Sequence, residues 1–178
     1  MKIFVTGYMA SGKTTFGKAL AEKLNVPFID LDQYIESKAE ATIAEIFEDR
    51  GESGFREIER DMLREAVAEA ENMVLACGGG TPCFHDNMEF LNSNGITVFL
   101  ETSTPVLIAR LQEQNATRPL VAGKSNDEIE EKVLYQLRER LPFYMESKLK
   151  WSGDDLNSEA EINSNTQTFL SSYPSIFR

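Results

Sequence analysis

Residues 7–14, GYMASGKT, have the types and spacing of a loop that binds phosphate groups: a glycine, four residues, Gly12, Lys13 and a hydroxyl side chain. The glycines let the backbone wrap a phosphate, and amides at the start of a following helix stabilise its charge. Lys13 adds a cation, and the Thr14 hydroxyl suits Mg²⁺. The sequence therefore predicts an ATP-type nucleotide site, and its binding residues in this loop are Gly7, Ala10, Ser11, Gly12, Lys13, Thr14 and Thr15.

Asp30 and Asp32 form a second candidate site, at the end of an expected strand over residues 26–30. Because alternate residues of a strand point in different directions, one carboxylate can face a metal ion while the other faces a substrate in the same crevice. The alternative is a pair of carboxylates that cap the next helix. The phosphate-binding loop nearby favours the first interpretation.

Three consecutive glycines, Gly78, Gly79 and Gly80, follow another expected strand at 73–77. Because they lack side chains, their backbone amides can approach a ligand closely and donate hydrogen bonds to a phosphate in transfer. A tight turn needs only one glycine or two. The run of three therefore favours a ligand site over a plain turn.

The elements that must position these residues are apolar runs typical of buried parallel strands, which alternate with stretches of helical spacing. Strands are expected at 2–6, 26–30, 73–77, 96–100 and 149–151. Helices are expected after the loop 7–14, from the capping box of Thr42 and Glu45, over about 55–70, after Thr104 as N-cap, and over about 127–146. This order predicts a three-layer α/β/α fold around a parallel sheet of about five strands, with ligands outside the carboxyl ends of the strands.

Three segments of the second half carry more specific expectations. In the helix over about 127–146, Ile129, Val133, Leu137 and Leu141 recur at four-residue steps, and Pro142 should kink or end the regular part. Residues of about 112–126 are polar and lack periodicity, which predicts a flexible excursion between helices. The tail 152–178 has a weak helical pattern near 158–170 and is either a final helix packed on the core or a partly disordered extension.

Length and composition place all of these motifs in one domain over residues 1–178. The chain is 42% hydrophobic and 26% charged, which is typical of a globular protein and not of a disordered one. Its net charge of −11 argues against nucleic acid and anionic membranes as partners. With no apolar run that spans a bilayer and no secretory signal, we expect a cytoplasmic protein. Cys77 and Cys83 lack the spacing of a zinc site.

Further motifs follow in a fixed order along the chain. They are Asp30-x-Asp32, Ile46-Phe47, Gly51-Glu52, Phe55-Arg56-x-x-Glu59, Cys77-Gly78-Gly79-Gly80, Arg118-Pro119-Leu120 and Arg140-x-Pro142-x-Tyr144. Together with the loop 7–14 they have the order and spacing of shikimate kinases, and the chain resembles that family from residue 1 to about 150. The resemblance implies Mg²⁺-dependent transfer of a phosphoryl group from ATP to the 3-hydroxyl of shikimate, a step towards chorismate and the aromatic amino acids, by a monomer.

The resemblance also implies roles for the residues that match. The implied catalytic residues are Lys13, Asp32, which accepts or orients the proton of the attacking hydroxyl, and Arg118, which closes over the phosphates in the lid. The implied metal ligands are Thr14 and Asp30, and Arg110 and Arg118 join the residues that bind ATP. The implied substrate-binding residues are Asp32, Phe47, Phe55, Arg56, Gly78, Gly79, Gly80 and Arg140, many of them in a region of about 32–62. In this set Arg56 and Arg140 clamp the carboxylate, and Glu59 holds Arg56.

Several points stay open at this stage. Arg110 could instead form a surface salt bridge, and Phe47 and Phe55 could belong to the core. The family commonly has a third glycine where this chain has Ala10. The residues that pack the adenine cannot be aligned after Trp151. Two rival functions remain: another small-molecule P-loop kinase, for gluconate or a nucleoside monophosphate, and a regulatory module that binds ATP without transferring phosphate.

Overall fold

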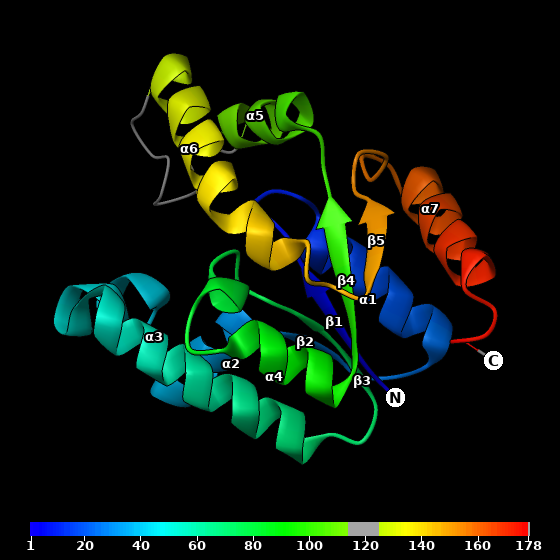
Figure 1. Ribbon diagram of the computed structural model, residues 1–178, viewed down its shortest axis with the longest axis horizontal. Helices are drawn as coiled ribbons and strands as arrows, with labels where there is room; N and C mark the ends of the chain where they lie inside the picture. Colours follow the sequence, from blue (N-terminus) through cyan, green and yellow to red (C-terminus); the bar gives the residue numbers. More distant parts are fainter. Residues whose placement is uncertain (114–124, 178) are drawn as a thin grey trace.

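The sheet has five parallel strands in the order β2-β3-β1-β4-β5 (Figure 1). The structure is a computed structural model and describes residues 1–113 and 125–177. The strands are β1 (Lys2–Thr6), β2 (Phe28–Asp30), β3 (Met73–Ala76), β4 (Ile96–Glu101) and β5 (Leu149–Ser152). The predicted α/β fold class is confirmed. Because every strand runs in the same direction, all carboxyl ends meet at one edge of the sheet.

Helices cover both faces of this sheet. They are α1 (Lys13–Leu24), α2 (Leu31–Ala39), α3 (Ile43–Glu69), α4 (Asn87–Asn94), α5 (Thr104–Glu113), α6 (Asn126–Tyr144) and α7 (Glu159–Ser172), with a short 3₁₀ turn, η1 (Thr81–Cys83). Alternate residues of β1 point to opposite faces of the sheet. Ile3 and Val5 pack in one core with α1 and α7, whereas Phe4 packs in another core with α2, α3 and α4. A third cluster, around Phe99, packs α5 and α6 against the strand ends.

The helix boundaries agree only in part with the signals in the sequence. Thr42 and Glu45 form the expected capping box at the start of α3. The sequence predicts a short helix here and a separate longer one over about 55–70, but the structure joins the two in α3, with a break at Gly51, which has φ +67°. A residue without Cβ adopts this backbone at low cost, so the helix changes direction there without ending. Thr104, expected as an N-cap, lies within α5.

The prediction for the inner face of α6 was partly wrong. Ile129 and Val133 are buried, but Leu141 is 40% exposed and Tyr144 takes the buried place. A step of four residues exceeds the helical repeat of 3.6, so a row of such steps drifts around the helix. From Val133 the buried face therefore returns eleven residues later, at Tyr144. Pro142 lies inside α6, close to its end.

The C-terminal segment forms a helix packed on the core. Phe169 on α7 is fully buried, and its ring lies 5.3 Å from those of Phe16, Trp151 and Tyr173, centroid to centroid. The expected lid over about 112–126 lies mainly outside the described residues. Within the described ranges no helix is both long and apolar enough to cross a bilayer.

The packing of α7 predicts that Phe169→Ala lowers the free energy of unfolding by about 3–5 kcal/mol, because it removes a buried ring and leaves a cavity. Urea denaturation followed by circular dichroism measures this change. Ser171→Ala, an exposed change on the same helix, serves as the control and should stay within about 0.5 kcal/mol of the wild type. Equal stability of the two variants would mean that α7 is not part of the cooperative core.

Candidate functional site

The loop between β1 and α1 places a lysine in the first turn of the helix. Lys13 is 9% exposed, and its Nζ donates a hydrogen bond of 2.7 Å to the carbonyl oxygen of Tyr8. Ala10, which stands where the family commonly has glycine, has φ +60°. This left-handed backbone costs more free energy for alanine than for glycine, because alanine has a Cβ atom. Ala10 nevertheless adopts it. The buried Ser11 hydroxyl has no hydrogen-bond partner among the described residues.

Thr14 and Asp30 bring a hydroxyl and a carboxylate together beside this loop. The Thr14 hydroxyl donates a hydrogen bond of 2.7 Å to Oδ2 of Asp30. The other oxygen, Oδ1, lies 3.5 Å from the amide nitrogen of Gln33 and caps α2. The capping interpretation therefore holds for Asp30, while its other oxygen faces the Thr14 hydroxyl. Uncharged and anionic oxygen atoms are the ligands that Mg²⁺ prefers, so this pair fits the ion.

Four charged side chains approach the backbone at Gly78–Gly80, and Oε1 of Glu59 would lie 3.1 Å from a Cβ atom at residue 78. A Cβ atom at residue 78 would lie 3.0 Å from Oδ1 of Asp32, and one at residue 79 would lie 3.5 Å from Nη1 of Arg140. At Gly80 the corresponding distance to Nη2 of Arg56 is 2.6 Å, so a Cβ atom at this position would require the guanidinium to shift. Gly79 also faces the nucleotide loop, 3.3 Å from the Met9 amide nitrogen by the same measure. The sequence-predicted carboxylate and both arginines thus meet on one glycine turn.

Arg56 is held on several sides. The side chain is buried, and its Nη1 donates a hydrogen bond of 2.7 Å to Oε2 of the buried Glu59. The Cζ atom lies 4.2 Å from the centroid of the Phe84 ring and 5.0 Å from that of Phe55. Nη2 has only a long contact, 3.5 Å to Glu52, and Nε has no partner among the described residues. A buried donor without a partner is costly, which favours an anionic ligand along this edge of the guanidinium.

Asp32 lies in the first turn of α2; the residue as a whole is exposed, but protein atoms surround most of its carboxyl group. Burial raises the pKa of this carboxyl to about 6, and the charges of Asp30 and Glu59 add to the rise while Lys13 opposes it. A carboxylate with a pKa close to neutral is a more effective proton acceptor than one at the usual value. The pKa of Asp32 is therefore closer to neutral than that of an ordinary aspartate.

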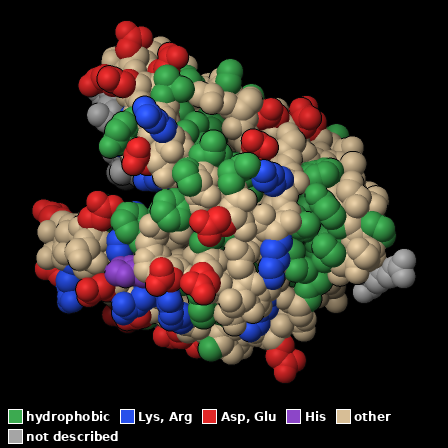
Figure 2. All heavy atoms as spheres, in the orientation of Figure 1, with side chains coloured by type: hydrophobic (Ala, Val, Ile, Leu, Met, Phe, Trp, Pro, Cys, Tyr) green, Lys and Arg blue, Asp and Glu red, His purple; other side chains and the backbone are tan. Residues whose placement is uncertain are grey.

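Arg140 lies on α6, and its guanidinium lies near Gly79 and the Tyr8 ring. Its Cζ lies 5.7 Å from the centroid of the Tyr8 ring, and the neighbouring Tyr144 hydroxyl donates a hydrogen bond to the carbonyl oxygen of Gly79. Burial raises the pKa of Tyr8 to about 12, so the phenol stays neutral. In Figure 2 the surface is hollowed between the part built from α6 and the part built from α3, the helices that carry Arg140 and Arg56.

The two phenylalanines of the predicted site stack on each other, 4.4 Å between centroids. Phe55 is 3% exposed and belongs to the core beneath α3, while Phe47 is half-buried and packs against that core. The core interpretation therefore holds for Phe55. Only Phe47 keeps open surface for a ligand.

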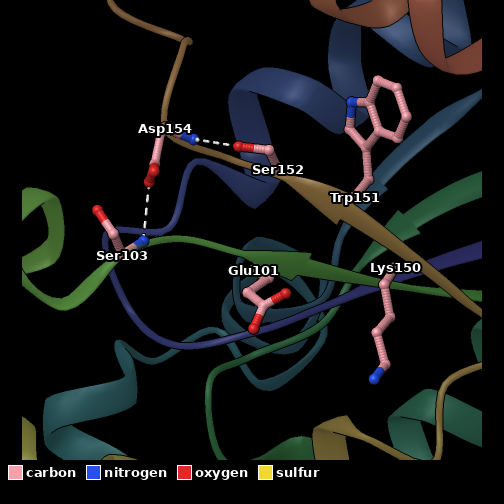
Figure 3. A pocket seen from close by; sticks show the side chains of 6 residues that line it. All are labelled: Glu101, Ser103, Lys150, Trp151, Ser152 and Asp154. Carbon is pink, nitrogen blue, oxygen red and sulfur yellow. Dashed lines mark hydrogen bonds between the residues drawn. The ribbon is translucent and has the colours of Figure 1, made fainter.

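Arg110 makes no surface salt bridge among the described residues. Its guanidinium donates to backbone carbonyls on both sides, at 3.4 Å to Ala10 and at 3.0 Å and 2.8 Å to Gly153 and Asp154. It therefore ties the nucleotide loop to the segment after β5. Beside that segment lies a hollow of about 390 Å³, lined by Glu101, Ser103, Lys150, Trp151, Ser152 and Asp154 (Figure 3). The amide of Ser103 donates a hydrogen bond of 2.8 Å to Asp154, while Trp151 points away from Lys150.

One predicted residue, Thr15, lies apart from this cluster. Thr15 is exposed on α1, and Arg118 falls outside the described residues. Sequence reasoning missed Thr81 and Phe84, which contact Glu59 and Arg56. The only signal for Thr81 was its position directly after the three glycines, and Phe84 had none.

Comparison with known proteins agrees with this geometry. The sequence model of the family described as shikimate kinase matches residues 9–171. The chain belongs to the shikimate kinase family. A shikimate kinase of Bacteroides thetaiotaomicron is 51% identical over 167 residues, which cover 94% of this chain and 95% of that protein. A shikimate kinase of Flavobacterium psychrophilum is 39% identical, over 86% of this chain and 90% of the relative.

Solved structures of shikimate kinases have the same fold. The crystal structure of the enzyme from Bacteroides thetaiotaomicron has a TM-score of 0.93 and 49% identity, with 98% of both chains covered. The shikimate kinase from Acinetobacter baumannii, solved in complex with shikimate, has a TM-score of 0.83 and 34% identity, over 98% of this chain and 93% of that one. The likeness therefore extends beyond residue 150, where the sequence motifs end.

The surroundings of Asp32 predict how its pKa responds to substitution in the ligand-free protein. Carboxyl ¹³C NMR should report a pKa near 6. Asp30→Asn should lower it, because a neighbouring negative charge is lost, whereas Lys13→Ala should raise it, because a neighbouring positive charge is lost. A pKa near 4 in the wild type, or shifts of the same sign in both variants, would contradict this account.

Proposed function

We propose that this protein transfers the γ-phosphoryl group of ATP to the 3-hydroxyl of shikimate and produces shikimate 3-phosphate, a step towards chorismate and the aromatic amino acids. The observation that carries the proposal is the convergence of Asp32, Arg140 and Arg56 on Gly78–Gly80, beside the nucleotide loop. An acceptor with hydroxyl groups and a carboxylate needs a carboxylate for the former and guanidinium groups for the latter. Membership in the shikimate kinase family supports the same acceptor.

Arg56 and Arg140 are assigned to the substrate carboxylate. Glu59 occupies Nη1 of Arg56, so Nε and Nη2 form the edge that offers two parallel N–H donors. A planar guanidinium suits a carboxylate better than a lysine does, because it donates two hydrogen bonds in a fixed geometry. Burial of Arg56 strengthens this interaction, since little water competes for the donors.

Asp32 is assigned to the acceptor hydroxyl, whose proton it orients or accepts. With a pKa of about 6 it is mostly ionised at pH 7 and can take up a proton as the hydroxyl attacks. Gly78, next to Asp32, and its neighbours Gly79 and Gly80 are assigned to backbone contacts beside the acceptor hydroxyl, because they let the charged side chains approach the backbone closely.

The donor side is assigned to the nucleotide loop. Gly7, Ala10, Ser11, Gly12 and Thr15 belong to the stretch that wraps the phosphates, and Lys13 supplies a positive charge to them. Thr14 and Asp30 would hold Mg²⁺, which supplies charge neutralisation to the phosphates when bound. Phosphoryl transfer depends mainly on position and charge compensation, so these groups suffice without a covalent intermediate.

The remaining assignments rest on less of the structure. Phe47 is assigned to the apolar side of the acceptor, within a substrate-binding region of about 32–62, while Phe55 supports it from the core. Arg118 is assigned to the lid of about 112–126, where it compensates charge in the transition state. Arg110 and the segment 153–157 are assigned to the adenine end, because Arg110 joins that segment to the nucleotide loop.

A monomer that acts in the cytoplasm stays the expected form. Every residue assigned above comes from one chain, so the reaction requires no second copy. The cytoplasmic location rests on the sequence alone.

A coupled assay of ADP release with shikimate, gluconate and AMP tests the acceptor. We expect turnover with shikimate alone, and loss of that turnover in Lys13→Ala, because its cation no longer stabilises the phosphates. Lys23→Ala, an exposed lysine on the same helix, is the matched control and should keep full activity. Turnover with gluconate or AMP would indicate one rival kinase, and slow ATP hydrolysis that no acceptor accelerates would indicate a regulatory module.

The carboxylate clamp predicts that Arg56→Ala raises the KM for shikimate by about tenfold or more and changes the KM for ATP little, because the lost donors contact only the acceptor. Arg60→Ala removes an arginine from the same helix that pairs with the exposed Asp61, so both constants should stay close to the wild type. An unchanged KM for shikimate in Arg56→Ala would exclude this residue from the clamp.

A further inference from the structure

The residues that follow the glycine turn contact the arginine of the proposed clamp through Glu59. The Thr81 hydroxyl donates a hydrogen bond of 2.6 Å to Oε1 of Glu59, whose other oxygen accepts Nη1 of Arg56 at 2.7 Å. Thr81 is fully buried and Glu59 is 1% exposed. A buried carboxylate needs a partner on each oxygen, and these two hydrogen bonds supply one for each. Thr81 therefore fixes the direction in which Glu59 presents its charge to Arg56.

The backbone of Thr81 is also fixed by hydrogen bonds on both sides of the residue. Its carbonyl oxygen accepts a hydrogen bond of 2.9 Å from Nδ2 of Asn87, and its amide donates to the carbonyl oxygen of Gly78 at 3.2 Å. Asn87 is fully buried, and its Oδ1 accepts Nη1 of Arg64 at 3.0 Å. A continuous series of buried and partly buried polar contacts thus runs from α3, through the start of α4, to the glycine turn.

The chain between Thr81 and Asn87 adds a second contact to the guanidinium. His85 and Asp86 both have positive φ, 51° and 56°. Side chains rarely adopt this backbone twice in succession, and such strain persists only where the surroundings hold it. Arg64 contributes, since its Nη2 lies 3.4 Å from the carbonyl oxygen of His85. The resulting turn sets Phe84 against Arg56, with its ring centroid 4.2 Å from Cζ.

We infer that Thr81 is a positioning residue for the substrate carboxylate: through Glu59, and together with Phe84, it orients Arg56 before the acceptor binds. The inference rests on the proposed function for the identity of the acceptor. It does not make Thr81 a catalytic residue, because the hydroxyl is buried beneath Glu59 and touches Arg56 only through it. An oriented guanidinium loses less side-chain freedom on binding, so the effect belongs to the affinity for the carboxylate.

Steady-state kinetics of Thr81→Val and Thr81→Ser test this role. Valine has nearly the shape of threonine and lacks the hydroxyl, so we expect the KM for shikimate to rise about tenfold while kcat and the KM for ATP stay within about twofold. Serine restores the hydroxyl and should return the KM for shikimate to within about twofold of the wild type.

Thr97→Val is the matched control. Thr97 is also fully buried and donates a hydrogen bond of 2.6 Å to Asn92, but it lies near the amino end of β4, away from the glycine turn. This variant should lower the melting temperature without changing either KM. An unchanged KM for shikimate in Thr81→Val, or an equal rise in Thr97→Val, would overturn the inference.

A crystal structure of ligand-free Thr81→Val separates this inference from the proposed function. We expect the Arg56 guanidinium to leave its contact with Glu59 or with Phe84 in the variant and to keep both in the wild type. Wild-type protein that does not phosphorylate shikimate would overturn the proposed function, and the two crystal structures would still decide whether Thr81 orients Arg56. An unmoved Arg56 would overturn the positioning role.

Discussion

The site depends on how closely charged side chains can approach a stretch of backbone without Cβ atoms. Asp32, Arg140 and Arg56 come from three different helices, and each reaches a different residue of Gly78–Gly80. A side chain at residue 80 would occupy the space of the Arg56 guanidinium. The glycine turn therefore fixes the separation between the group assigned to the acceptor hydroxyl and the groups assigned to its carboxylate.

In this crevice, individual cationic side chains must compensate the negative charge of the ligands. The chain carries a net charge of −11, so its general field repels anionic ligands, and binding must come from local cations. Arg56 is held in place by Glu59 and two aromatic rings, and Lys13 lies at the nucleotide loop. Burial raises the pKa of Asp32, and Glu59, which holds Arg56, adds to that rise, so the proposed base and the proposed clamp are electrostatically linked.

Parallel topology explains why distant parts of the sequence meet here. The nucleotide loop follows β1, Asp30 ends β2 and the glycines follow β3, and these strands are neighbours in the sheet. Parallel neighbours end at the same edge, so each loop opens towards the next. Arg140 reaches that edge from α6, which packs with α5 over the ends of the strands.

The sequence alone determined the features that rest on neighbouring residues: the nucleotide loop, the buried strands, the capping box of α3 and the alternation that predicts a parallel sheet. The order of the motifs was enough to indicate the shikimate kinase family. Tertiary structure decided the features that depend on contacts between distant residues. Arg110 bonds to carbonyls more than forty residues away on either side, α7 is held by rings from α1 and β5, and Thr81 reaches Glu59 across 22 positions. Such partners leave no local pattern, because a hydrogen bond between distant residues places no requirement on the spacing of the residues next to them.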